Sequence, residues 1–504
     1  MSTTLRGAPE RPTDPSEPSD PTDPSGRQAA PTTRDRPRRR SLFAGVWRWH
    51  FYASFLVLPV LAVLAVTGLV YLFRFQLEPA LHPDLMHLEP RPGVSAASYD
   101  DQREVVEEAL DADGLTGAYL SSMTEPKDAG SPTRFTATLP DESSRDYFVD
   151  PFRLEVLGSL DPDTTLSGTA VRLHADLMSG VVGDAVIELG ACWAIVMALT
   201  GYHLFVVGRR ARRRAARQAR VRADVRGRTD ARIRQTHAVV GAMAGVALLG
   251  LLVSGLPWTG VWGAKVQQLA ASHGTSLWSD DHGGASEPTT TMDESLPHSH
   301  ATDVPWGSQR SERPTSDVGD YRGTVANLDT AVLVADRTGL RHPYTTLLPD
   351  TPDGTFAVIG YAFDDPGQER TVHVDRYTGA VAGTYGYADY SDVAQVVSQG
   401  IALHEGRRLG TANMVLSAAM CLGILFLCVS GPVMWWRRRP KGAGRLGAPR
   451  GRLPLATTPG LVVGLVVLGV LLPLFGASLV LVLLLDQLVL RRVSVLARWL
   501  DVRG

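Results

Sequence analysis

The stretch WHFYASFLVLPVLAVLAVTGLVYLF, residues 49–73, is apolar for long enough to cross a membrane. A bilayer core of about 30 Å needs roughly 20 residues of helix. Polar residues are rare within the stretch, and they include a histidine and a threonine that is followed by glycine. His50 lies at its start, and the pair Thr67–Gly68 follows seventeen residues later. The stretch predicts a membrane-spanning helix that begins beside a histidine.

Other apolar runs of spanning length follow at wide intervals, at residues 185–207, 238–258 and 412–436. A last apolar stretch, residues 459–490, is too long for one ordinary span, and Pro473 breaks it near the middle. It predicts two short spans or a tight hairpin. The polar segments between the runs have room for small α+β domains. We expect an α-helical polytopic membrane protein with about six spans, a duplicated core of four, and two extracytoplasmic α+β domains.

Basic residues near the span ends set the expected orientation. Twelve Arg and two Asp lie between Arg209 and Arg234, and seven basic residues with no acid lie between Arg437 and Arg452. We expect these segments and both termini in the cytoplasm, touching anionic lipid rather than nucleic acid. A tail on the same side as the preceding loop requires an even number of crossings, which favours six spans over five.

The expected organisation follows from these runs and from a Pro-, Ser- and Thr-rich start that cannot bury apolar surface. The predicted segments are a disordered cytoplasmic N-terminus at 1–40, span one at 41–75, a first outer domain at 76–184, span two at 185–208, an Arg-rich cytoplasmic loop at 209–236, span three at 237–260, a second outer domain at 261–410, span four at 411–436, a basic cytoplasmic loop at 437–456, spans five and six at 457–490, and a cytoplasmic tail at 491–504.

An internal repeat relates the two halves of the chain. His50 precedes Thr67–Gly68 by seventeen residues, and His237 precedes Ser254–Gly255 by the same interval. The second match concerns the histidines that precede spans two and four. Each is followed 26 residues later by a similar pair: His174 by Thr200–Gly201, and His404 by Ser430–Gly431. Two matches in the same order predict a duplicated unit of span, outer domain, histidine and span.

The repeat places two histidines at each membrane face. A twofold axis along the membrane normal would bring His50 near His237 on the cytoplasmic side, and His174 near His404 on the outer side. Two facing imidazoles are what a six-coordinate haem needs. The glycines would let a neighbour or a planar ligand approach closely. Two alternatives remain open: the histidines could simply anchor helix ends, and His203 could compete as an inner ligand.

Charged residues beside the outer histidines fit the same interpretation. Arg172 lies two residues before His174, and Glu405, Arg407 and Arg408 follow His404. An arginine near a haem can pair with a propionate through a charge-assisted contact. We therefore expect Arg172 and Arg407 to belong to the cofactor site.

Several motifs resemble the PepSY-associated transmembrane family, which includes bacterial iron-regulated membrane proteins and ferric-siderophore reductases. They are WRWH (47–50), RLHADLMSG (172–180), ALHEGRRLG (402–410), and the outer YFVDPFRLEVLG (147–158) and VHVDRYTGAVAG (372–383). The resemblance covers roughly residues 41–490. The sequence THAVVG (236–241) departs from the family pattern because it lacks the usual basic residue after the histidine.

The resemblance implies a protein of the bacterial cytoplasmic membrane with two PepSY-like outer domains and two b-type haems. It implies iron ligation by His50, His174, His237 and His404, and electron transfer from a quinol or a cytoplasmic donor to an extracytoplasmic ferric chelate such as a siderophore. On this basis the chain is a candidate ferric-chelate reductase in iron uptake.

Other chemistry finds less support. The sequence has no C-x-x-C-H motif for covalently attached haem, no H-E-x-x-H, no Walker motif, and no G-x-G-x-x-G that opens a helix after a strand. Residues 272–313 contain several His and Asp residues that could bind a transition metal, but a solvated loop is the simpler interpretation. The alternative function is a haem-free PepSY membrane protein that binds or regulates a peptidase or another partner, or handles metal.

Overall fold

A computed structural model describes most of the chain. The described residues are 35–221, 225–271, 314–316, 326–439, 446–447, 458–490 and 492–500.

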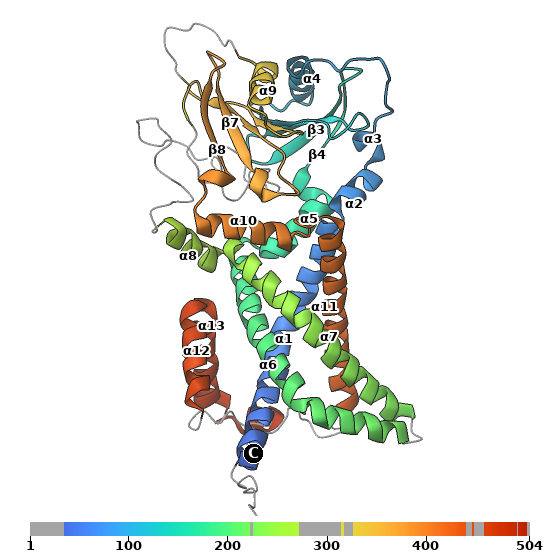
Figure 1. Cartoon of the computed structure of the whole chain (residues 1–504), viewed down its shortest axis with the longest axis vertical. Helices are drawn as coiled ribbons and strands as arrows, with labels where there is room; N and C mark the ends of the chain where they lie inside the picture. Colours follow the sequence, from blue (N-terminus) through green and yellow to red (C-terminus); the bar gives the residue numbers. More distant parts are fainter. Residues whose placement is uncertain are drawn as a thin grey trace, which may run out of the picture.

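Four long helices form the core of the molecule: α1 (Asp35–Leu72), α6 (Gly180–Val221), α7 (Val225–Gly255) and α11 (Thr411–Arg438). Each packs against two of the others, so that α1 lies diagonally opposite α7 and α6 lies opposite α11. Figure 1 shows these helices running together below a β-sheet. We call the end of the bundle next to the sheet the outer end, and the opposite end the inner end.

The described part of the chain has five helices that are long and apolar enough to cross a membrane, which supports the predicted polytopic membrane protein. They are Leu42–Leu72, Gly180–Ala211, Thr229–Trp258, Thr411–Arg438 and Pro473–Leu490. A shorter apolar helix, α12 (Pro459–Leu471), precedes the last of them. The count of six spans therefore stays a prediction.

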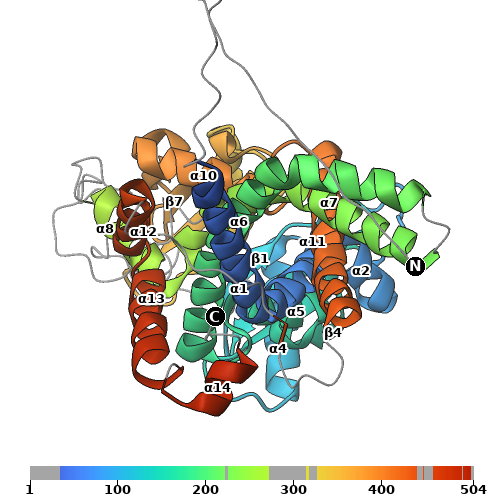
Figure 2. The ribbon, with the colours of Figure 1, turned by 90° about the horizontal axis from the view of Figure 1, so that it is seen from below.

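The last apolar stretch folds as a pair of short helices, α12 and α13 (Pro473–Leu485), that pack against each other beside the core (Figure 2). Gly469 and Gly476 lie in contact where the two helices meet. The thirteen residues of α12 span about 20 Å, which is less than a bilayer core, whereas the helix that begins with α13 continues to Leu490. The following helix α14 (Ser494–Trp499) lies at the inner end, where Arg48 Nη2 on α1 donates to the Leu500 carbonyl at 3.0 Å. The tail thus returns to the end at which α1 begins.

Strands from both polar segments form one eight-stranded antiparallel sheet, in the order β4-β3-β2-β1-β5-β6-β7-β8. The strands are β1 (Tyr119–Thr124), β2 (Thr133–Thr138), β3 (Ser144–Asp150), β4 (Glu155–Leu160), β5 (Thr345–Leu347), β6 (Thr355–Ile359), β7 (Arg370–Asp375) and β8 (Val381–Gly386). The order is symmetric about the β1–β5 pair, in which Met123 lies opposite Thr346. This symmetry supports the predicted duplication, but the two predicted outer domains share a single sheet rather than forming two.

A single apolar core joins the two halves of the sheet to helices α4 (Tyr99–Ala112) and α9 (Leu328–Arg337). Alternate strand residues point into this core, such as Phe135 and Ala137 on β2, because successive side chains of a strand face opposite sides. Figure 1 shows α4 and α9 together on the face of the sheet that is turned away from the bundle.

Two short helices lie between the sheet and the bundle: α5 (Leu166–Asp176) and α10 (Asp392–His404) (Figure 1). Each begins at a hydroxyl residue that accepts a backbone N–H, Thr165 from Gly168 and Ser391 from Ala394. These helices carry the outer histidines. The remaining helical elements are α2 (Arg74–Leu81), α3 (Pro83–Met86), α8 (Gly260–Ala271), the short turns Pro162–Thr164, Leu256–Trp258, Pro366–Gln368 and Tyr387–Asp389, and a π-helical turn at Asp486–Leu490.

Two predicted boundaries differ from the structure. Helix α1 begins at Asp35, inside the segment 1–40 that was expected to be disordered. The segment 209–236, expected as a loop, is helical in its described residues, 209–221 and 225–236. Alanine and arginine have high helix propensities, so the composition that marks this segment as basic also extends α6 and α7.

Candidate functional site

His174 and His404 meet at the outer end of the bundle. Their ring centres lie 6.2 Å apart, and the ring planes are perpendicular. Burial, reinforced by the neighbouring His404 ring, lowers the pKa of His174 to about 4, and burial also lowers the pKa of His404. Both rings are therefore neutral at pH 7, and each keeps a lone pair on one nitrogen. The predicted outer pair is thus brought together.

Each outer histidine contacts a hydroxyl on a core helix. His174 Nδ1 lies 2.9 Å from Thr67 Oγ1 on α1. His404 Nδ1 lies 3.1 Å from Ser254 Oγ on α7, and also 3.1 Å from the carbonyl oxygen of Leu251.

The inner histidines repeat this arrangement. His50 Nδ1 lies 3.0 Å from Thr200 Oγ1 on α6 and 3.1 Å from the Met197 carbonyl oxygen. His237 Nδ1 lies 2.7 Å from Ser430 Oγ on α11. His50 and His237 come from diagonally opposite helices and are close enough to interact electrostatically. None of the four histidine–hydroxyl contacts involves His203.

The hydroxyl contacts assign the tautomer of the imidazoles. A helical Ser or Thr can donate its proton to a carbonyl of the preceding turn. Thr67 donates in this way to Val63 O at 2.8 Å, and Ser254 to Gly250 O at 2.9 Å. Their oxygens then accept a hydrogen bond from Nδ1–H of the histidine. A carbonyl can only accept, so the Leu251 contact of His404 requires the same assignment. The unprotonated nitrogen is Nε2, which is the state that ligates a metal.

The glycine that follows each hydroxyl residue lies against the ring, and at Gly255 and Gly201 a side chain would crowd it. A Cβ atom built on Gly255 would lie 3.0 Å from His404 Cε1, and one on Gly201 would lie 3.2 Å from His50 Cε1. The corresponding distances are 3.7 Å at Gly68 to His174 and 3.9 Å at Gly431 to His237. The sequence predicted close approach of a neighbour at these glycines, and the neighbour is an imidazole.

The helix that carries an inner histidine also carries the hydroxyl that contacts an outer histidine. The spacing of residues along one helix could not predict this exchange of partners. Helix α1 carries the inner histidine His50 near one end and the outer contact Thr67 near the other. Helix α7 does the same with His237 and Ser254. Each histidine is therefore paired with a hydroxyl–glycine pair from a different helix, not with the pair that follows it in sequence.

Arg407 and Arg172 occupy different surroundings. Arg407 Nε forms an ion pair with Glu405, and its Nη1 donates to the Phe363 carbonyl at 2.6 Å. Its guanidinium also lies over the Phe363 ring. Two of its nitrogens thus interact with Glu405 in the turn after α10 and with the Phe363 carbonyl in the loop before β7. Arg172 lies on α5, partly buried, two residues before His174.

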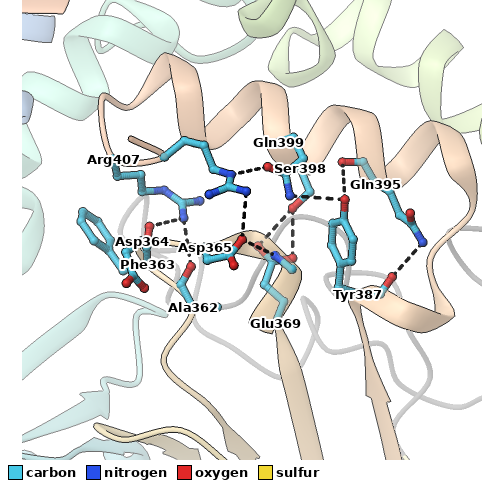
Figure 3. A network of polar contacts seen from close by, with 12 residues as sticks. Ala362, Phe363, Asp364, Asp365, Glu369, Tyr387, Gln395, Ser398, Gln399 and Arg407 are labelled. Atoms are coloured by element: carbon cyan, nitrogen blue, oxygen red, sulfur yellow. Dashed lines mark hydrogen bonds and ion pairs between the residues drawn. The ribbon is translucent and has the colours of Figure 1, made fainter. Parts of the chain in front are cut away.

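A polar network that sequence reasoning missed fixes α10 to the sheet (Figure 3). Ser398 donates to the buried carboxyl of Glu369 at 3.1 Å, and Arg408 forms an ion pair with Asp365 at 3.3 Å. Burial raises the pKa of Glu369 to about 7. The network holds in place the helix whose last residue is His404.

The alternative of a metal site away from the four histidines finds no support within the described residues. These contain no group of three or more His, Cys, Asp or Glu side chains that could hold a bare metal ion. The His- and Asp-containing segment 272–313 lies outside the described residues.

Comparison with known proteins identifies one family. A family model described as the PepSY-associated TM region matches residues 47–438, which include all four histidines. No curated protein sequence matches the chain.

Proposed function

Because the chain belongs to the PepSY-associated TM region family, we propose that it is a transmembrane electron-transfer protein that binds two b-type haems. One haem would be held near the outer end of the bundle by His174 and His404. The other would be held near the inner end by His50 and His237. Electrons would pass outward, from a quinol or a cytoplasmic donor to an extracytoplasmic ferric chelate such as a siderophore.

The observation that carries this proposal is the geometry of the outer histidines. Two imidazoles bound to one metal through Nε2, at about 2.0–2.1 Å each, have ring centres roughly 6 Å apart. The observed separation of 6.2 Å agrees with this value. Both Nδ1 atoms contact hydroxyl oxygens, which leaves both Nε2 atoms unprotonated.

The number of donors also favours haem over a bare ion. Each site offers two imidazoles, and the described residues provide no third His, Cys, Asp or Glu ligand. A structural or catalytic zinc site needs three or four protein ligands. A porphyrin supplies four nitrogen ligands itself, so the protein needs to provide only the axial ligands. Two histidines per site are therefore a complete set for haem and an incomplete one for zinc.

A bound haem would supply one-electron chemistry, and the protein would supply ligation, orientation and low dielectric. The imidazoles are held in one tautomer by the hydroxyls of Thr67, Thr200, Ser254 and Ser430. The apolar side chains of the bundle core between the two ends, such as Val57, Leu61 and Ile424, exclude water. In the overall reaction each chelated Fe(III) gains one electron that the donor loses, and reduction weakens its hold in the chelate.

We further propose that the sheet lies outside the cytoplasmic membrane and that the inner end faces the cytoplasm. The Arg-rich ends of α6 and α7 and the tail all lie at the inner end, and basic residues are retained on the cytoplasmic side. The test is labelling of single cysteines, introduced into a chain without its own three, from outside intact cells. We expect no labelling of Arg220→Cys and efficient labelling of Asp364→Cys; the reverse result would invert the topology.

The test of the function has two steps. The protein purified after expression with ample haem should show a Soret band and two haems per chain by pyridine haemochrome assay. In proteoliposomes, chemically reduced protein should then be reoxidised by a ferric chelate added on the side of the sheet. A protein without a Soret band would instead favour the haem-free binding protein.

A further inference from the structure

We propose that the four hydroxyl residues Thr67, Thr200, Ser254 and Ser430 are positioning residues that set the reduction potentials of the haems, and that they act on the haem at the end where they lie. This inference rests on the proposed function. It predicts that residues on one helix control different haems: on α1, His50 controls the inner haem and Thr67 the outer one.

The first argument is that the contact occurs at four places, twice in each half of the duplicated core. All four histidines direct Nδ1 at a Ser or Thr oxygen, at distances between 2.7 and 3.1 Å. The four hydroxyls also contact carbonyls of their own helices, from 2.8 Å at Thr67 and Thr200 to 3.5 Å at Ser430. A packing accident would not reproduce one donor, one acceptor and one following glycine four times.

The second argument concerns what the hydrogen bond does to the ligand. A ligating histidine that donates its other N–H to an acceptor becomes a more basic ligand, and its ring orientation is fixed. A more basic axial ligand stabilises Fe(III) more than Fe(II), which lowers the reduction potential. Removing the acceptor should therefore raise the potential of the haem that the histidine ligates.

The third argument predicts that the two hydroxyls of the inner site shift the reduction potential by different amounts. His50 Nδ1 has two acceptors, Thr200 Oγ1 and the Met197 carbonyl. His237 Nδ1 contacts Ser430 Oγ at 2.7 Å, and no carbonyl acceptor accompanies it among the described residues. Removing the Ser430 hydroxyl should leave Nδ1–H without a partner, whereas His50 would keep its carbonyl. We expect a larger rise in the inner potential for Ser430→Ala than for Thr200→Val.

The experiment is a potentiometric titration of the full-length purified protein, followed in the Soret and α bands. Thr67→Val removes the hydroxyl and keeps the shape of the side chain, and Thr67→Ser keeps the hydroxyl as the matched control. Each is measured in the His237→Ala background, which is expected to retain only the outer haem, and in the His404→Ala background, which is expected to retain only the inner one.

We expect Thr67→Val to raise the potential of the outer haem and to leave the inner haem unchanged, with Thr67→Ser close to the parent protein. Selective loss of the outer haem in Thr67→Val would also show that the hydroxyl orients His174. A shift of the inner haem, or no change in either haem, would overturn the inference. If the wild-type protein itself binds no haem, the proposed function fails instead, so the two failures are distinguishable.

Discussion

The imidazole rings of His174 and His404 lie with their centres 6.2 Å apart and their planes perpendicular, although they come from opposite halves of the chain. The two residues lie in the last turns of corresponding helices, α5 and α10, which are situated between the shared sheet and the bundle. The β1–β5 pair joins the two halves above them and thereby fixes the relative position of the two helices. One continuous sheet thus sets the distance between the two proposed ligands.

The glycines of the outer site give a matched pair of variants. A methyl group on Gly255 would lie 3.0 Å from His404 Cε1 and would push the ring away, whereas one on Gly68 would meet His174 at an ordinary contact distance of 3.7 Å. We expect Gly255→Ala to reduce or shift the outer haem signal and Gly68→Ala to leave the haem content unchanged, as measured by pyridine haemochrome assay and visible spectra. Equal effects of the two variants would refute this account of the glycines.

The inner site offers the same contrast. Gly201→Ala would bring a methyl group within 3.2 Å of His50, and Gly431→Ala would leave 3.9 Å to His237. We expect Gly201→Ala to perturb the inner haem alone, with the outer haem serving as the internal control. A perturbed outer haem in Gly201→Ala would contradict the assignment of this glycine to the inner end.

Arg407 and Arg172 should differ in their effects. Arg407 pairs with Glu405 and donates to the Phe363 carbonyl, so Arg407→Ala removes the charged partner of a nearly buried carboxylate and leaves it the hydrogen bond from the Tyr71 hydroxyl. Hydrogen bonds to charged groups contribute about 1.5–3 kcal/mol, and we expect a destabilisation of this order in thermal unfolding, with haem content retained. Arg172→Ala should instead weaken haem retention if Arg172 pairs with a propionate. Loss of haem in Arg407→Ala at unchanged stability would assign the propionate contact to Arg407.

The buried carboxyl of Glu369 predicts a pH dependence of stability. Its folded-state pKa is raised from 4.5 to about 7, chiefly by burial, against the opposing effects of Ser398 and Arg407. The folded state therefore binds more protons than the unfolded state between these values, so stability is highest below pH 4.5 and falls as the pH rises to about 7. A pKa difference of this size corresponds to about 3–4 kcal/mol at most.

Glu369→Gln should remove this part of the pH dependence. We expect the variant to be more stable than wild type at pH 8 and to lose that advantage at pH 5, as followed by tryptophan fluorescence during thermal unfolding in detergent. The difference between the two proteins cancels other titrating groups, including His342. A stability difference that is the same at both pH values would show that Glu369 does not titrate in this range.

The parts of the fold that follow from local chemistry could be predicted from the sequence. A bilayer demands long apolar helices, so the hydropathy of residues 49–73 and its counterparts located the core helices. The duplicated spacing of His50 and His237, and of His174 and His404, predicted which histidines would form pairs, and the outer pair is found together.

The remaining features depend on contacts between distant residues. The pairing of Met123 with Thr346 joins the two outer segments into one sheet, and nothing in either strand alone specifies that partner. Likewise, helical periodicity places Thr67 relative to His50 but cannot say which neighbouring helix brings His174 to it. The contact of Glu369 with Ser398 depends on how the sheet docks on α10.

The most direct test of the central claim is the number of haems per protein in wild type, His174→Ala, His404→Ala and the double variant. If both histidines ligate one outer haem, each single variant should lose about half of the haem, and the double variant should lose no more than either single, because the two ligands serve one site. The inner haem should survive in all three variants, because His50 and His237 lie at the other end of the bundle. A double variant that loses twice as much haem as either single would show that the two histidines serve separate sites and would contradict the pairing.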